Sequence, residues 1–187
     1  MKVVGLAGWS GAGKTTLLVK LLPELARRGL AVSTVKRAHH AFDVDRPGKD
    51  SFEHRRAGAR EVLVASDVRF ALMHEVGEGE RPPELADLLR RLAPVDLVVV
   101  EGFKRGLHPK VEVHRAANGE GFLHDAVANV RAVVTDADRT GLRLPSAHLD
   151  DVAAAADLVL AAAESLDRVL ADLDEPWGGL SSRGKMV

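Results

Sequence analysis

Short apolar runs alternate with helical patterns along most of the chain. Runs rich in Val and Leu predict strands, and Leu repeats at helical spacing predict the helices between them. Residues 97–100 are apolar at every position, as expected of a central strand covered on both faces. The predicted strands are residues 2–7, 31–36, 61–66, 69–75, 95–100 and 130–135, and the predicted helices are 14–28, 51–58, 83–92 and 150–170.

Three local features refine this pattern. Pro23 lies inside the first predicted helix and lacks a backbone donor, so we expect a kink or an early end there. Gly29 is the expected C-cap. The run Val111-Glu112-Val113-His114 precedes the glycine-rich turn of residues 118–121, which predicts a hairpin at the edge of a sheet.

A glycine-rich loop follows the first strand. Residues 8–16 read Gly-Trp-Ser-Gly-Ala-Gly-Lys-Thr-Thr, which fits the phosphate-loop (P-loop) pattern G-x-x-x-x-G-K-[ST] between a strand and a helix. Backbone N–H groups of such a loop surround a phosphate, and the helix dipole adds to their attraction. The predicted nucleotide-binding residues here are Ser10, Gly11, Ala12, Gly13, Lys14, Thr15 and Thr16. Lys14 is expected to reach the β- and γ-phosphates, and the Thr15 hydroxyl to bind Mg²⁺.

Strand–helix alternation around this loop predicts an α/β fold of the P-loop NTPase type, with a mainly parallel central sheet in a three-layer arrangement. With 187 residues, the chain has the length of one domain. We expect a single nucleotide-binding domain over residues 1–172. Periodicity is lost after it, so residues 173–187 are predicted to form a flexible tail.

Carboxylates near the phosphates are sorted by strand direction, because ligands of an open parallel sheet lie beyond the carboxyl ends of its strands. Asp96 and Glu101 bracket one strand and lie roughly 16 Å apart when extended. Only Glu101 is at the carboxyl end, so it is the predicted second Mg²⁺ ligand, directly or through water. The alternative is a solvated charge at a strand end.

The segment of residues 36–51 also leaves the carboxyl end of a strand and is rich in charge. Asp43 is a further candidate metal ligand, with Asp45 as its alternative. Lys36, Arg37 and Lys49 are candidates for phosphate contacts. Asp50 or Ser51 is expected to cap the next helix. The alternative for each of these charged residues is a solvated surface charge with no ligand.

Another acidic pair follows the predicted strand 130–135. Asp136 or Asp138 is placed to accept hydrogen bonds from guanine, as the last residue of [NT]-K-x-D does in GTPases. Thr135 and Asp138 fit that pattern, whereas Asp136 replaces its lysine. The alternative is an ordinary turn.

Composition narrows the possible partners. The formal net charge is −1 and the pI about 6.7, which argues against a nucleic-acid or membrane-surface partner. Cysteine is absent, which excludes disulfides and thiolate metal sites and fits a cytoplasmic protein. We see no leader pattern and no apolar run approaching 18 residues. The eight histidines lack metal-site spacing, since the H-E-x-x-H pattern that begins at His74 has Glu78 at its last position.

The chain resembles the MobB family. The P-loop is shared with many families, but two other stretches are far more particular: D-x-D-x-P-G-K-D-S at residues 43–51, and E-G-F-K at 101–104 with P-K-x-E-V at 109–113. Ala57-Gly58-Ala59 and the Lys36, His39 and His40 positions also match, while Arg37 stands where the family is expected to have histidine. The resemblance covers roughly residues 1–160.

This resemblance implies a homodimer that binds GTP with Mg²⁺ and hydrolyses it slowly. It also implies a MobA-like guanylyltransferase as partner, in the synthesis of molybdopterin guanine dinucleotide. Slow hydrolysis agrees with the sequence, which has no D-x-x-G switch and no arginine evidently placed for catalysis. A surface near Lys104, Lys110 and Arg115 is a candidate contact for the partner or for the phosphate of molybdopterin.

Two other functions remain open. One is a P-loop small-molecule kinase, with Asp43 or Glu101 as base or metal ligand and residues 37–50 as a lid. The other is a nickel- or cobalt-insertion GTPase, with His39 and His40 as ligands of the transported metal.

Overall fold

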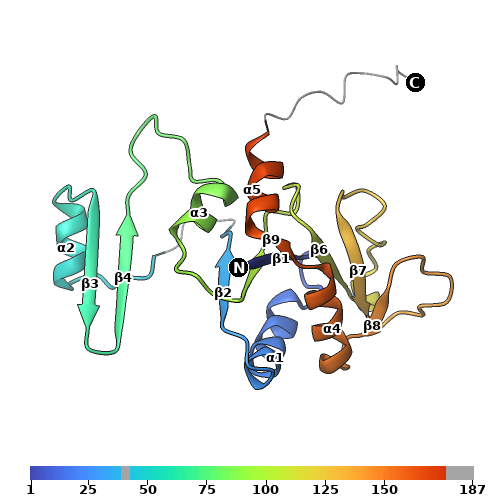
Figure 1. Ribbon diagram of the computed structural model, residues 1–187. Helices are drawn as coiled ribbons and strands as arrows, with labels where there is room; N and C mark the ends of the chain where they lie inside the picture. Colours follow the sequence, from blue (N-terminus) through green and yellow to red (C-terminus); the bar gives the residue numbers. More distant parts are fainter. Residues whose placement is uncertain (39–42, 176–187) are drawn as a thin grey trace, which may run out of the picture. The chain divides into compact units, whose positions relative to one another are not determined.

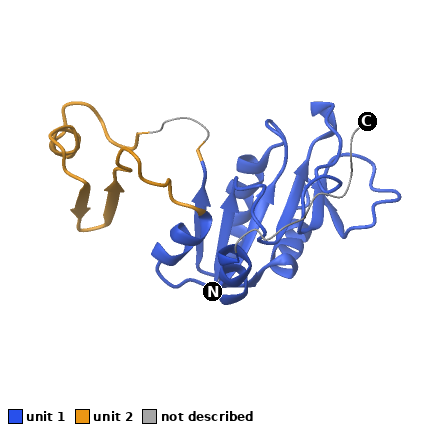
Figure 2. Cartoon of the chain, turned by 90° about the horizontal axis from the view of Figure 1, so that it is seen from above, with its two compact units in different colours: residues 1–37, 85–187 blue, residues 38–84 orange. Residues whose placement is uncertain are grey.

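A computed structural model describes residues 1–38 and 43–175 of the chain. The chain divides into two compact units, shown in separate colours in Figure 2. The sheet unit contains residues 1–37 and 85–187, and the hairpin unit contains residues 38–84. The single nucleotide-binding domain over residues 1–172 and the flexible tail over 173–187 stay predictions.

The sheet unit is built on a seven-stranded, mainly parallel sheet (Figure 1). Six strands follow the order β2-β5-β1-β6-β7-β8 with every neighbouring pair parallel, and the short β9 pairs antiparallel with β1. Helices flank the sheet, so the predicted α/β fold of the P-loop NTPase type is confirmed. The strands are β1 (Lys2–Ala7), β2 (Val32–Lys36), β5 (Leu97–Glu101), β6 (Lys110–His114), β7 (Val130–Thr135), β8 (Ser146–His148) and β9 (Glu164–Ser165). The helices are α1 (Lys14–Arg27), α3 (Leu85–Arg91), α4 (Val152–Ala162) and α5 (Leu166–Asp174), with a 3-10 turn at Ala116–Asn118.

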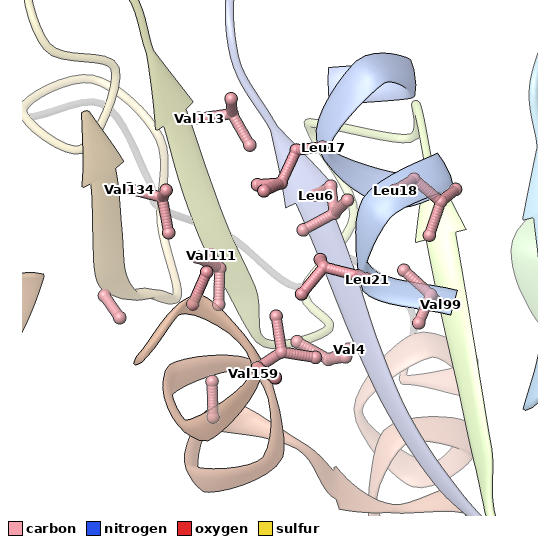
Figure 3. Close-up of a cluster of buried hydrophobic side chains, with 14 of the residues drawn as sticks. Val4, Leu6, Leu17, Leu18, Leu21, Val99, Val111, Val113, Val134 and Val159 are labelled. Atoms are coloured by element: carbon pink, nitrogen blue, oxygen red, sulfur yellow. The ribbon is translucent and has the colours of Figure 1, made fainter. Parts of the chain in front are cut away.

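Two apolar cores, one on each face of the sheet, hold the helices in place. Val4 and Leu6 of β1 contribute to the first core, which α1 and α4 cover, while Val3 contributes to the second, which α3 and α5 cover. Figure 3 shows the first core, with Leu17 and Leu21 of α1 facing the strands. Successive side chains of a strand point to opposite faces, so a strand covered on both faces is apolar throughout.

Helix α1 continues through Pro23 to Arg27, so the predicted early end is wrong. Buried Leu21 and Leu25 on either side of the proline hold this turn against the sheet, which compensates for the missing backbone donor. The C-cap residue is Arg28, one position before the expected Gly29. Gly29 follows it with φ +80° and ends the helix, and its N–H donates to the Ala26 carbonyl at 2.9 Å.

Two other expectations about elements are wrong. Strand β6 lies inside the sheet, parallel to both β1 and β7, and is not part of an edge hairpin. The single helix expected over residues 150–170 is two helices, because β9 interrupts it. All five residues of β6 are buried, including Lys110, Glu112 and His114, and these polar residues made the strand look half exposed in the sequence.

The hairpin unit contains α2 (Asp50–Arg56), β3 (Glu61–Ser66) and β4 (Arg69–His74). The two strands are antiparallel and pair from Glu61↔His74 to Ser66↔Arg69, and α2 contacts β3. No helix in the described residues of either unit is long and apolar enough to cross a bilayer.

Candidate phosphate-binding site

The loop between β1 and α1 forms the centre of the site. Gly13 is the N-cap of α1 with φ +90°, and as a glycine it offers no side chain to accept hydrogen bonds from the N–H groups of the first turn. The N–H groups in the first turn of a helix have no partners within the helix. They therefore point away from the helix end, where an anion is favoured.

Gly8 allows β1 and β6 to approach closely at the start of this loop. A Cβ atom at Gly8 would lie 2.3 Å from the backbone oxygen of Val113. Gly11 and Gly13 both have φ in the left-handed region, +76° and +90°. A side chain at any of these three positions would either collide with β6 or strain the loop.

Lys14 lies across the loop. Its Nζ donates hydrogen bonds to the carbonyls of Gly8 and Trp9, each at 2.9 Å. Burial lowers the pKa of the Lys14 ammonium, and Glu101 opposes this shift, while Lys104 and Lys36 add to it. Three ammonium groups therefore gather around one carboxylate at the P-loop, which favours a polyanionic ligand.

The structure brings Thr15 and Glu101 together. Thr15 Oγ1 donates to Glu101 Oε1 at 2.8 Å, and Lys36 Nζ lies 3.4 Å from the same oxygen. Glu101 ends β5, the strand next to β1, and is only 8% exposed. A hydroxyl and a carboxylate are the oxygen ligands that Mg²⁺ prefers beside phosphate oxygens and water. By contrast, Asp96 at the other end of the strand accepts a hydrogen bond from the Ala31 N–H.

A tight turn follows Glu101. Gly102 and Phe103 both have positive φ, +98° and +47°, and a Cβ atom at Gly102 would lie 2.9 Å from Arg37 Cβ. The Arg37 N–H donates to the Glu101 carbonyl at 3.0 Å, and its guanidinium lies 5.2 Å from the centre of the Phe103 ring. Arg37 therefore packs onto this turn.

The loop after β6 contacts the P-loop from the other side. Asn118 Nδ2 donates to the Ser10 carbonyl at 3.0 Å, and Trp9 Nε1 donates to the Gly121 carbonyl at 2.9 Å. The Lys104 ammonium lies over the Trp9 ring, 4.9 Å from its centre. Sequence reasoning missed Trp9 and Asn118, because the first is a variable position of the motif and the second was interpreted only as a turn residue.

Arg115 and Asp136 lie at this same side. Arg115 Nη1 is 3.8 Å from Asp136 Oδ2, and the Ala116 N–H donates to Asp136 Oδ1 at 2.7 Å. Asp138 accepts two hydrogen bonds from Thr140, at 2.9 Å from its N–H and 2.8 Å from its hydroxyl. These bonds lower the pKa of Asp138. The expected role of both carboxylates in guanine recognition stays a prediction.

Lys110 does not lie on the surface, so its expected place beside Lys104 and Arg115 in a surface contact is wrong. Its side chain is fully buried, and Nζ donates to the carbonyls of His108 and Ala128 at 2.8 and 3.2 Å. Burial lowers the pKa of this ammonium to about 8. The buried carboxylate of Glu112 similarly accepts hydrogen bonds from the N–H and Nδ1 of His124. These two members of the P-K-x-E-V stretch thus fasten the loops on either side of β6.

The predicted acidic ligands of residues 43–51 belong to the hairpin unit. Arg55 Nη2 donates to both oxygens of Asp43 at 2.8 Å, which lowers the pKa of this carboxyl. Asp45 accepts a hydrogen bond from the Ser51 hydroxyl at 3.0 Å. The N-cap of α2 is Lys49, whose side chain makes no capping hydrogen bond, so the expected capping by Asp50 or Ser51 is wrong. The expected metal contact of Asp43 and phosphate contact of Lys49 stay predictions.

His39 and His40, the ligands expected for a metal-insertion GTPase, lie outside the described residues. Within residues 1–38 and 43–175, no three His, Asp or Glu side chains gather in a way that could hold a metal ion.

Comparison with known families identifies the chain. The family model MobB, described as molybdopterin guanine dinucleotide synthesis protein B, matches residues 3–136, which include the P-loop, Glu101 and Arg115. The chain belongs to the MobB family. It is 42% identical over 162 residues to the molybdopterin-guanine dinucleotide biosynthesis adapter protein of Escherichia coli K12, covering 84% of this chain and 91% of that protein. The Haemophilus influenzae protein of the same name is 45% identical over 113 residues, 60% of this chain and 63% of that one.

Solved structures of MobB proteins share the fold. The Bacillus stearothermophilus MobB homologue aligns with a TM-score of 0.60 and 28% identity, covering 85% of this chain and 95% of that one. A second crystal structure, of molybdopterin-guanine biosynthesis protein B, aligns with a TM-score of 0.62 and 30% identity over 85% of this chain and 98% of that one. Both alignments cover nearly the whole length of the solved MobB chain.

Proposed function

We propose that this MobB-family protein is a GTP-binding adapter in the synthesis of molybdopterin guanine dinucleotide, acting in the cytoplasm. The observation that carries the proposal is the Lys14 ammonium held within a glycine loop at an uncapped helix start, in a chain of this family. The relatives named above are called adapter proteins. A triphosphate is the ligand that such a loop suits.

Mg²⁺ is proposed to accompany the nucleotide, held by the Thr15 hydroxyl and by Glu101, directly or through water. The 2.8 Å contact between these two side chains supports their sharing one ion. Mg²⁺ commonly takes only one or two protein ligands and completes its shell with phosphate oxygens and water. Bound there, it would neutralise charge on the phosphates.

GTP hydrolysis is proposed to be slow. Fast GTPases position water with a side chain from a mobile switch that follows the metal-binding strand. Here the residues after Glu101 are Gly102, Phe103 and Lys104, and Arg37 packs onto their turn. None of these four residues offers a neutral amide or a carboxylate to orient water.

The partner is proposed to be a MobA-like guanylyltransferase, which joins a guanosine monophosphate group to molybdopterin. Lys104 is exposed beside the P-loop, and the Arg115 side chain is 41% exposed on the other side of it. Cations in these positions suit the partner surface or the phosphate of molybdopterin. The base is proposed to be recognised at the end of β7 by Asp136 or Asp138.

Dimerisation is proposed to use the hairpin unit. One face of its two strands presents Leu63, Phe70 and Leu72, which are 62%, 73% and 51% exposed. An isolated two-stranded hairpin is marginally stable in water, and contiguous exposed apolar patches commonly mark interfaces. A second copy of the chain is the proposed cover.

Calorimetric titration of GTP with Mg²⁺ into the wild type and Lys14→Ala tests the central proposal. The substitution removes a charge directed at phosphate, so GTP binding should be lost while the unfolding temperature changes little. Pull-down of a MobA-like guanylyltransferase with and without GTP then tests the adapter role. Equal GTP affinity in the two proteins would show that the loop is not the nucleotide site.

A further inference from the structure

Arg115 and Asp136 leave two neighbouring strands at the same level. In the register of β6 and β7, His114 lies opposite Thr135. The residues that follow them, Arg115 and Asp136, are therefore neighbours at the carboxyl end of the sheet. Strand β6 also borders β1, which leads into the P-loop. The pair therefore lies directly beside the start of α1.

The guanidinium of Arg115 lies close to the P-loop, beside Gly13. A Cβ atom placed on Gly13 would lie 3.3 Å from Arg115 Nη2 and 3.8 Å from Nε. Gly13 is the N-cap of α1, where the uncapped N–H groups favour phosphate. A guanidinium offers five N–H donors in a planar array that suits phosphate oxygens. Arginine is therefore present at the phosphate site within the chain, although the sequence showed none evidently placed there.

Asp136 contacts both the Arg115 guanidinium and the backbone next to it. One carboxylate oxygen lies 3.8 Å from Arg115 Nη1, and the other accepts the N–H of Ala116 at 2.7 Å, so Asp136 restrains both the side chain and the backbone that carries it. Asp138 differs, because its hydrogen bonds come from Thr140 and the Arg139 backbone, within its own turn.

We infer that Arg115 binds the phosphate chain of the nucleotide from within the same chain, and that Asp136 is its positioning residue and not a reader of the base. This inference rests on the proposed nucleotide-binding function and narrows it. Arg115 then serves the nucleotide in place of the partner or molybdopterin, and base recognition is left to Asp138.

Affinities for Mg²⁺-GTP, Mg²⁺-GDP and Mg²⁺-ATP, measured by calorimetry at fixed salt, test the inference. Arg115→Ala should weaken GTP binding by roughly 10- to 100-fold, as expected for charge-assisted hydrogen bonds, and Arg115→Lys by less. Arg91→Ala, which removes an exposed arginine at the end of α3, is the matched control and should bind GTP normally.

The double variant separates positioning from base recognition. Asp136→Asn keeps an oxygen for the Ala116 N–H but loses its charge, so it should weaken GTP binding in the wild type and add little in the Arg115→Ala background. The ratio of GTP to ATP affinity should stay as in the wild type. Fully additive losses together with a fall in that ratio would make Asp136 a base reader and overturn its positioning role.

The outcome for Lys14→Ala distinguishes the two proposals. If that variant loses GTP while Arg115→Ala binds as the wild type does, only the present inference fails. If Lys14→Ala also binds normally, the proposed function fails first. Thermal unfolding of each variant shows whether a loss of binding reflects a loss of the fold.

Discussion

At the scale of single residues, the least expected feature is a buried histidine. His108 is fully buried, and neither ring nitrogen has a hydrogen-bond partner among the described residues. Burial lowers the pKa of His108 to about 3, and the nearby ammonium of Lys110 acts in the same direction. The ring is therefore neutral in the folded protein at neutral pH and costly to protonate.

Acid should destabilise the protein through this residue. Between the usual histidine pKa of 6.5 and about 3, the unfolded chain binds a proton that the folded chain does not, so the free energy of unfolding falls as pH falls. His108→Phe keeps a ring of similar shape and removes the titration. As pH falls below 6.5, the free energy of unfolding of this variant should rise relative to that of the wild type, by about 1.4 kcal/mol per pH unit. Urea unfolding at a series of pH values measures this difference. A constant difference between the two proteins across the range would contradict it.

Glu101 makes a second prediction at this scale. Glu101→Gln keeps an oxygen for the Thr15 hydroxyl but loses the negative charge, so the apparent affinity for Mg²⁺ in the GTP complex should fall by about 10-fold or more. GTP binding in EDTA should be unchanged or tighter, because a carboxylate near the phosphates is gone. Mg²⁺ titrations of the GTP complex measure both effects. A similar loss of affinity with and without Mg²⁺ would instead indicate a purely structural role.

At the scale of elements, the P-loop depends on a close approach of β1 to β6. Gly8→Ala would bring a methyl group to 2.3 Å from the backbone oxygen of Val113, which cannot move without disturbing the centre of the sheet. We expect a loss of about 2 kcal/mol or more in the free energy of unfolding, with weaker GTP binding. Gly121→Ala is the control, since no atom lies within 4 Å of its added methyl group. Chemical denaturation of both variants measures this loss. Equal stabilities would show that β6 shifts to accommodate the methyl group.

The elements also show how far sequence reasoning reaches. The P-loop followed from its motif between a strand and a helix. The position of Glu101 followed from strand direction, because the carboxyl ends of parallel strands meet at one edge of the sheet. The place of β6 did not, because Lys110 and Glu112 are buried through contacts with loops whose paths no local pattern reveals. For the same reason, the contact of Arg115 with Gly13 depends on strand order, which connects residues about a hundred positions apart.

At the scale of the whole molecule, the two units differ in how their apolar residues are covered. The sheet unit encloses its Val and Leu side chains between layers of helices. In the hairpin unit, Val62 is 8% exposed, but Leu63, Phe70 and Leu72 on the opposite face of the strands are open. A face of this kind is typical of a surface that another chain covers, so the hairpin unit is the natural place to test self-association.

Phe70→Glu should convert the proposed dimer into a monomer. Phe70 lies opposite Ala65 on the exposed face, so a charge there would be desolvated by a second copy without crowding the interior of the unit. Val19→Glu is the control, since Val19 is an exposed valine, at 63%, on α1 of the sheet unit. Sedimentation velocity at several concentrations should give a halved mass for the first variant and the wild-type mass for the second. Because the P-loop and its contacts among the described residues lie within the sheet unit, the monomer should still bind GTP. A wild-type mass for Phe70→Glu would exclude this face as the dimer contact.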